Sequence, residues 1–103
     1  MLIITSENIP GQNYQVLGTA KGSVVQAKHV GRDIMAGLKT IVGGEIRGYT
    51  ELMNESRSIA TNRMIDEARA LGADAVICFR YSSASVMAGS SEIMAYGTAV
   101  KFV

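Results

Sequence analysis

The chain has 103 residues, which is enough for a single domain over residues 1–103. Its 10 lysines and arginines nearly balance 9 aspartates and glutamates, so no long-range field would attract nucleic acid or an anionic membrane. No segment approaches the roughly 18 apolar residues of a transmembrane helix. With one cysteine and no pattern typical of a secretory leader, we expect a cytoplasmic protein.

The first part of the chain predicts two strands. Residues 2–5 form a short apolar run, and residues 6–13 carry the Asn, Pro and Gly typical of a loop. Residues 14–28 form a long Val-rich segment that Gly18 and Gly22 interrupt. Glycines inside a strand predict a bend, a bulge or the close approach of another backbone.

The middle of the chain predicts two helices. Apolar residues recur at helical spacing over residues 31–42, and Gly43-Gly44 would end that helix. The same spacing extends over residues 50–71, where Thr50 is the expected N-cap and Gly72 the residue that closes the helix.

The last part predicts two more strands. Residues 73–79 turn abruptly apolar, and a serine-rich stretch with Gly89 reads as a solvated strand end and turn. The final strand, residues 93–103, is apolar on both faces, so both faces need cover. Two helices are few to cover both faces of this strand, so the sequence favours a neighbouring subunit as the cover of one face. The predicted order is β-β-α-α-β-β, an α+β subunit with a four-stranded mixed or antiparallel sheet and two helices.

Several segments together resemble the YbjQ-like family of small proteins. They are Glu7-Asn8-Ile9-Pro10-Gly11, Gly22-Ser23-Val24-Val25, Arg32-Asp33, Gly43-Gly44-Glu45, Tyr49, the stretch from Gly72 to Ile77, and Ala95-Tyr96-Gly97-Thr98-Ala99-Val100. The resemblance implies an α+β subunit that assembles with itself into a cyclic ring, with a pentamer as the expected oligomer. The family carries a heavy-metal-binding label, but the resemblance brings no ligand residues onto this sequence.

A metal ion is the one cofactor that the residues and this label raise. Thiolate and imidazole sites need several ligands, commonly as CxxC or paired His. This chain has one Cys and one His, so Cys78 and His29 are weak candidates. We expect Cys78 to be a small buried core residue and His29 to lie at the surface. A ring that gathers one ligand from each subunit around its axis is the physical route to a metal site.

The sequence does not indicate an enzyme. The serines lack the GxSxG motif of a nucleophile elbow. Gly43-Gly44 with Arg32 and Arg47 could cradle an anion, but no phosphate-binding glycine motif accompanies them, and a helix-ending glycine pair is the favoured interpretation.

The long predicted helix carries charges where apolar residues are expected. Arg57, Arg63 and Glu67 fall within the apolar arc, where unpartnered charges are unusual. They would snorkel, form ion pairs between subunits, or line a ligand pocket, and we favour ion pairs. These three residues, with Arg32 and Asp33, are our ligand or interface candidates. We expect a metal-binding or small-ligand-binding module whose site is completed by assembly, or alternatively a purely structural ring.

Overall fold

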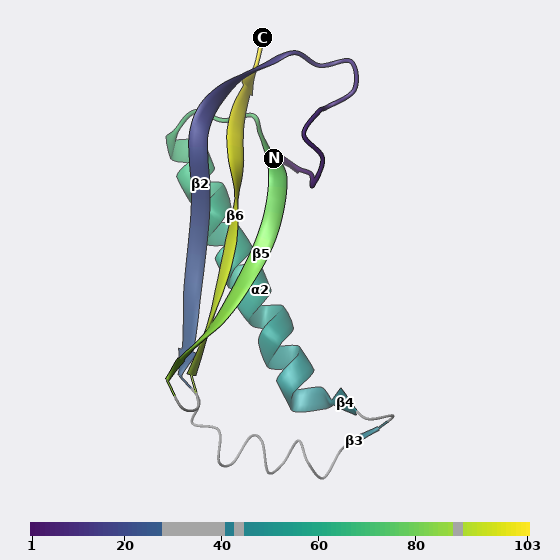
Figure 1. Cartoon of the computed structure of the whole chain (residues 1–103), viewed down its shortest axis with the longest axis vertical. Helices are drawn as coiled ribbons and strands as arrows, with labels where there is room; N and C mark the ends of the chain where they lie inside the picture. The colour runs from purple at the N-terminus through teal and green to yellow at the C-terminus, as the bar shows by residue number, and fades with distance from the viewer. Residues whose placement is uncertain (28–40, 43–44, 88–89) are drawn as a thin grey trace.

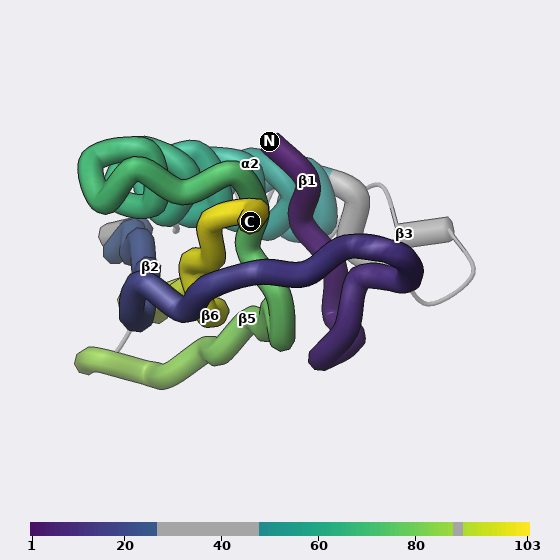
Figure 2. The backbone as a smooth tube through the Cα atoms, turned by 90° about the horizontal axis from the view of Figure 1, so that it is seen from above, coloured from purple at the N-terminus to yellow at the C-terminus, as the bar shows by residue number. Residues whose placement is uncertain are grey.

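One long helix lies across a four-stranded sheet in the computed structural model, which describes residues 1–27, 41–42, 45–87 and 90–103 (Figure 1). Figure 2 shows the helix and the strands as two layers. The α+β class and the four-stranded mixed sheet are thus confirmed. The elements are β1 (Leu2–Ile3), β2 (Tyr14–Ala27), β3 (Ile41–Val42), β4 (Glu45–Ile46), α2 (Arg47–Ala70), β5 (Ala75–Met87) and β6 (Ser90–Phe102).

The sheet has the strand order β1-β5-β6-β2, and β3 and β4 form a separate two-stranded ribbon. β6 runs antiparallel to both of its neighbours, whereas the short β1 is parallel to β5. β2 and β6 pair along their whole lengths, with a register shift between Val16 and Gly18. A bulge, one of the alternatives that the sequence raised for Gly18, is therefore confirmed, and this glycine has a φ of 145° that few other residues tolerate.

Of the two residues expected to mark the ends of α2, only the one at the C-terminal end is confirmed. The helix begins at Arg47, so the expectation of Thr50 as N-cap is wrong. Gly72 does close the helix, with a φ of 84°. Its N–H donates to the Arg69 carbonyl at 2.9 Å and the N–H of Ala73 donates to the Ala68 carbonyl at 3.0 Å. This pair of bonds is a Schellman motif, which satisfies carbonyls that the helix end would otherwise leave unpaired.

Two core clusters lie on opposite faces of the sheet. The larger cluster joins α2 to the sheet through small aliphatic side chains, with Met64 as its largest fully buried member. Its buried residues are Ala20, Val24, Ala60, Met64, Ala68, Val76, Ile93, Ala95 and Ala99. The smaller cluster contains Ala75, Ile77 and Val100, and the N-terminal segment contributes Ile4 and Ile9 to its margin.

Gly22 is where β2 and α2 come closest. A Cβ atom at this position would lie 2.3 Å from both the Ala60 carbonyl oxygen and the Met64 nitrogen. These are backbone atoms of the helix, which cannot move aside as a flexible side chain would. The close approach of another backbone, one of the alternatives that the sequence raised for this glycine, is therefore confirmed at Gly22.

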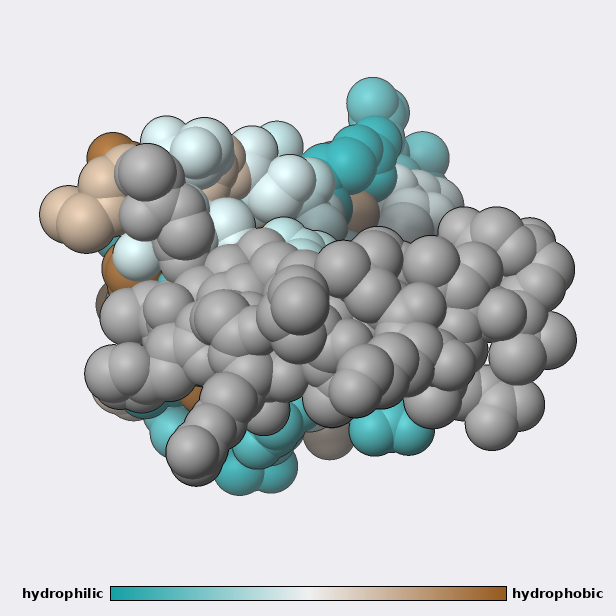
Figure 3. Space-filling view, turned by 90° about the horizontal axis from the view of Figure 1, so that it is seen from below, coloured by the Kyte–Doolittle hydropathy of each residue, from teal (hydrophilic) through white to brown (hydrophobic). Residues whose placement is uncertain are grey.

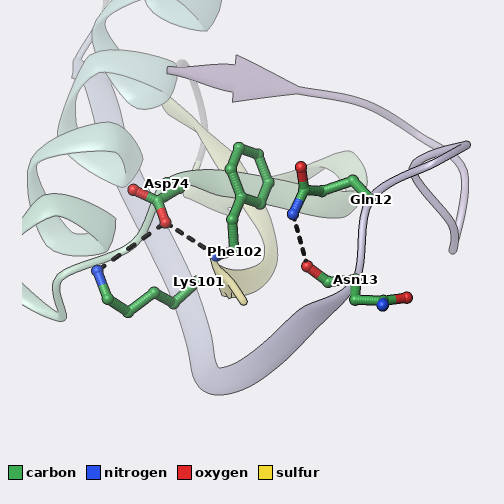
Figure 4. A network of polar contacts seen from close by, with 5 residues as sticks. All are labelled: Gln12, Asn13, Asp74, Lys101 and Phe102. Carbon is green, nitrogen blue, oxygen red and sulfur yellow. Dashed lines mark hydrogen bonds and ion pairs between the residues drawn. The ribbon is translucent and has the colours of Figure 1, made fainter.

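A polar contact joins the start of β5 to the end of β6 (Figure 4). The Asp74 carboxylate accepts a hydrogen bond of 2.8 Å from the Phe102 N–H and lies 3.9 Å from the Lys101 ammonium. Both charged side chains are well exposed, so the ion pair itself contributes little to stability. The contact fixes the register of the two strand ends.

The expectation of two helices is not supported. Ile41 and Val42, the last residues of the first predicted helix, form β3 instead, and residues 31–40 lie outside the described part of the chain. Both are β-branched residues, which favour strands over helices. No helix within the described residues is both long and apolar enough to cross a membrane.

The serine-rich stretch includes the solvated strand end that the sequence indicated, but β5 continues further through it than the expected residues 73–79. Ser82, Ser83 and Ser85 belong to β5, and Ser90 and Ser91 belong to β6. The two strands stay paired to Met87 and Ser90, so cross-strand hydrogen bonding overrides the loop preference of serine. Gly89, the expected turn residue, lies outside the described residues.

We expect Gly22→Ala to lower the free energy of unfolding by roughly 3 kcal/mol, because the added methyl group meets helix backbone in a packed layer. Urea denaturation measures the change. Ser23→Ala, on the next residue of the same strand, serves as the control and should change stability by less than about 0.5 kcal/mol. Equal effects of the two substitutions would show that the helix and strand are not in such close contact.

Candidate functional site

The structure places three of the candidate residues on α2, and only Arg57 is partly buried. Arg63 and Glu67 are exposed, at the margin of the stripe formed by the buried Ala60, Met64 and Ala68. His29, Arg32 and Asp33 lie outside the described residues. The apolar stripe of the helix is therefore narrower than its sequence suggested.

Arg63 has a clear partner within its own chain. Its Nη1 donates a hydrogen bond of 2.6 Å to the backbone oxygen of Ser23 on β2. The aliphatic stem thus reaches from the helix to the strand beside Gly22, where the two elements touch. This contact accounts for a cation at the margin of the stripe. Ion pairing of Arg63 or Glu67 with a neighbouring subunit stays a prediction.

Cys78 is half-buried rather than fully buried, which corrects the expectation of a core residue. It has a φ of 55° at a bulge, because β5 carries one extra residue relative to β6 between Ile77 and Arg80. The Cys78 N–H donates to the Ser6 oxygen at 3.1 Å instead of joining the ladder. This residue, whose backbone conformation is costly for a non-glycine residue, lies at the margin of the smaller core cluster.

A polar concavity of about 470 Å³ lies between α2 and β5. Five of its residues come from successive turns of one helix face, and the sixth comes from β5. The lining consists of Asn54, Arg57, Ser58, Thr61, Asn62 and Tyr81. It therefore contains one cation, five neutral hydrogen-bonding groups and no carboxylate.

Internal contacts hold the two ends of this concavity in place. Arg57 Nη2 donates to Asn54 Oδ1 at 2.5 Å. Thr61 Oγ1 donates to the Arg57 carbonyl at 2.7 Å and lies 2.8 Å from Tyr81 Oη. The Tyr81 ring also packs edge-on against Phe79, with centroids 4.8 Å apart and planes at 76°. Tyr81 is 46% exposed, yet contacts on two sides orient it.

A second concavity of about 330 Å³ lies further along β5. It is lined by Tyr49, Met53, Ser83, Ala84, Ser85, Ser90 and Ser91. The serines that the sequence grouped thus do gather in space, on paired strands and beneath the start of α2. The lining of this second concavity has hydroxyl groups but no charged side chain, so it offers a ligand fewer kinds of polar contact than the first.

The neutral face of α2 conflicts with the local preferences of a helix. Asn54, Ser58, Thr61 and Asn62 are all weaker helix formers than Ala, Glu or Lys, at a combined cost of roughly 2 kcal/mol relative to Ala. Ser58 and Asn62 are exposed, so core packing does not require them. Residues that break a local rule without a packing reason mark candidate functional positions.

We expect Ser58→Ala and Asn62→Ala each to raise the free energy of unfolding by about 0.5 kcal/mol, because alanine is the better helix former at an exposed position. Urea denaturation tests both variants. Glu55→Ala is the matched control, since glutamate and alanine differ less in helix propensity. A clear loss of stability in either variant would indicate a structural role for that side chain instead.

Comparisons with known proteins agree with this architecture. Residues 1–103 match a family model described as "Putative heavy-metal-binding". The chain is 62% identical over 92 residues to a UPF0145 protein of Helicobacter hepaticus, covering 89% of each chain. It is 57% identical over 104 residues to a UPF0145 protein of Vibrio campbellii, covering 100% of both.

A solved structure shares the fold. The crystal structure of a protein of unknown function from Pediococcus pentosaceus has a TM-score of 0.74 at 16% identity, covering 100% of this chain and 98% of that chain. The resemblance inferred from the sequence motifs is confirmed by the match over the whole chain. The chain therefore belongs to the YbjQ-like family, whose relatives are named UPF0145 proteins.

Proposed function

We propose that this chain is the subunit of a cytoplasmic homo-oligomeric ring, a pentamer by family resemblance, that binds a small ligand at sites completed where copies meet. The observation that supports assembly is a pair of long, open strand edges in the described sheet. β2, at one side of the sheet, pairs along its 14 residues with β6 alone among the described strands. β5 is the corresponding strand on the other side.

The outer edge of β5 is covered only near its start. β1 pairs with Ala75 and Val76, and the next ladder positions bond to the N-terminal segment, with the Phe79 N–H donating to the Ile4 oxygen at 3.0 Å. From Tyr81 to Met87 the strand is exposed. Its outer edge has no partner strand among the described residues.

Both edges carry apolar side chains. Val16 and Val25 of β2 are 59% and 53% exposed, and Val86 and Met87 of β5 are 53% and 65% exposed. In Figure 3, hydrophobic residues likewise gather at one rim of the visible surface. Natural proteins usually protect open edges with charges, proline or cover. Long edges with exposed apolar side chains favour pairing with another chain.

Pairing β5 of one copy with β2 of the next uses both edges at once. β2 and β5 both run antiparallel to β6 and therefore run parallel to each other within the sheet. In a cyclic assembly that keeps one strand direction around its axis, the joint between copies is therefore also parallel. Such a head-to-tail contact closes into a ring with no free edge, whereas a two-fold contact between β2 strands leaves β5 open.

This joint would also complete the polar concavity. α2 packs mainly on β2 and β6, and beyond Phe79 the hydroxyl groups of Thr61 and Tyr81 join it to β5. The helix-side face of β5 is otherwise largely bare from Tyr81 to Met87 (Figure 2). A neighbouring β2 brings its own α2 on that same side of the sheet. The bare face would then become the floor of a groove between two helices, with Tyr81 at its base.

The dimensions of the subunit also support assembly. The Cα radius of gyration is 16.7 Å, whereas a compact domain of this length has a value of about 13 Å. An elongated subunit buries less of its own surface than a compact one. Contact with further copies would recover part of that burial.

The described residues do not fit a heavy-metal centre. No three His, Cys, Asp or Glu side chains come together in the described ranges. Cys78 has no second Cys or His beside it among the residues that the structure describes, and the polar concavity presents a cation rather than carboxylates. The donor set therefore favours a small polar ligand over a metal ion.

We expect the wild-type protein to sediment with a mass several times that of one chain. Val25→Lys on β2 and Val86→Lys on β5 should each raise the dissociation constant at least about tenfold, because a lysine in the joint must lose water without a partner. Sedimentation equilibrium at micromolar concentration measures both effects.

Leu71→Lys is the matched control for these variants. Leu71 is a 44% exposed apolar residue just beyond the end of α2 and belongs to neither edge strand, so its substitution should leave assembly unchanged. A monomeric wild type would contradict the ring. A wild-type oligomer insensitive to both edge variants would place the joint elsewhere.

We also expect no tight stoichiometric site for zinc, copper or cadmium. Metal sites of this kind need several thiolate or imidazole ligands, and the chain has one Cys and one His. Isothermal titration of metal-free protein provides the measurement. A tight site that disappears in His29→Ala or Cys78→Ser would overturn this expectation.

A further inference from the structure

We infer that the concavity beside Arg57 binds the carboxylate or phosphate group of a small ligand, with Arg57 as its cationic partner. This inference deepens the proposed ligand-binding function and rests on it. It depends on the composition of the lining, on the way that Arg57 is held, and on the direction of the hydrogen bonds that end at Tyr81.

The lining selects the sign of the ligand charge. Arg57 is the single charged residue among the six that line the concavity. No carboxylate in that lining neutralises the guanidinium or repels an anion. A cationic ligand or a metal ion would meet one positive charge and no compensating negative one, so the site favours anions.

Arg57 is held in place before a ligand arrives. It is partly buried, and one of its terminal nitrogens already donates to Asn54 Oδ1. A guanidinium has five N–H donors in a planar fork, so several remain for a second partner. That fork matches the paired oxygens of a carboxylate or phosphate, which it contacts through two parallel hydrogen bonds.

Neutral donors from the same helix extend the site. Ser58 and Asn62 lie one turn apart on the face that carries Arg57, and both are exposed to the concavity. A hydroxyl group and a side-chain amide both donate to oxyanions without adding charge. These are the two residues whose presence in an exposed helix neither helix propensity nor core packing explains.

Tyr81 lies where the far end of the proposed ligand would sit. Thr61 has one hydroxyl proton, and that proton is donated to the Arg57 carbonyl. The hydrogen bond between Thr61 Oγ1 and Tyr81 Oη must therefore use the Tyr81 proton. The Tyr81 oxygen is left as an acceptor, so it suits a hydroxyl or ammonium group on a ligand whose anionic group contacts Arg57.

The test is a titration of ¹⁵N-labelled full-length protein with inorganic phosphate and, separately, with sodium acetate, at ionic strength held constant with sodium chloride. We expect saturable shifts at the Arg57 Nε–H and at the amides of Thr61 and Asn62. Arg57→Gln should weaken binding at least about tenfold, the value of one charge-assisted hydrogen bond. The stronger of the two probes identifies the oxyanion class.

Arg69→Gln is the control, because Arg69 is an exposed cation on the same helix but does not line the concavity. It should leave binding unchanged, and Arg57→Lys, which keeps the charge without the fork, should give an intermediate affinity. Absence of saturation with both probes, or equal losses in Arg57→Gln and Arg69→Gln, would overturn the inference.

Native mass spectrometry of the same variants separates this inference from the proposed ring. Anion binding that depends on Arg57 in a monomeric protein would support the site and refute its completion by assembly. An assembled protein that binds neither probe would refute the site and leave a structural ring. Arg57→Gln should remain assembled, because the proposed joint depends on the backbone pairing of the β2 and β5 edges, to which a side chain of α2 contributes no hydrogen bond.

Discussion

The contact between Gly22 and the backbone of α2 decides where the other parts of the molecule lie. Because no side chain separates strand from helix at this point, α2 rests directly on β2 and β6. The small side chains of Ala60 and Ala68 keep the distance between α2 and the sheet equally short along the helix. A helix in this position covers mainly β2 and β6, and the far half of β5 is left largely exposed. Open edge, bare face and polar concavity thus share one origin.

Most segment types and the backbone geometry at several glycines were predictable from the sequence, whereas the type of the segment before the long helix and the length of the serine-rich strand were not. Gly18, Gly22 and Gly72 each marked a real feature, because a glycine's role follows from its own φ or its lack of a side chain. The helix expected over residues 31–42 is not supported, since the β-branched Ile41 and Val42 pair with β4. The serine-rich stretch forms strand because β6 lies beside it, a partner that composition does not reveal.

The candidate site was only half visible in the sequence. Arg57 was a candidate because it is a charged residue at a position where helical spacing predicts an apolar one. The weak helix formers around it were a second signal, which an analysis of hydrophobic periodicity does not detect. Tyr81 could not have been found this way. Its place beside Thr61 depends on how β5 is registered against β6, which is a property of the folded sheet.

The bulge at Cys78 shows how much depends on that register. Before it, Val76 faces α2; after the extra residue, Phe79 and Tyr81 face α2 and Arg80 does not. The bulge therefore inverts the odd-even parity of the positions that follow it in β5, up to a second register shift between Ser85 and Met87. Deletion of one residue there would keep the strand paired but would exchange the side chains that face α2 with those that face away from it. The chemistry of the site therefore depends on the number of residues before Tyr81 as much as on their identities.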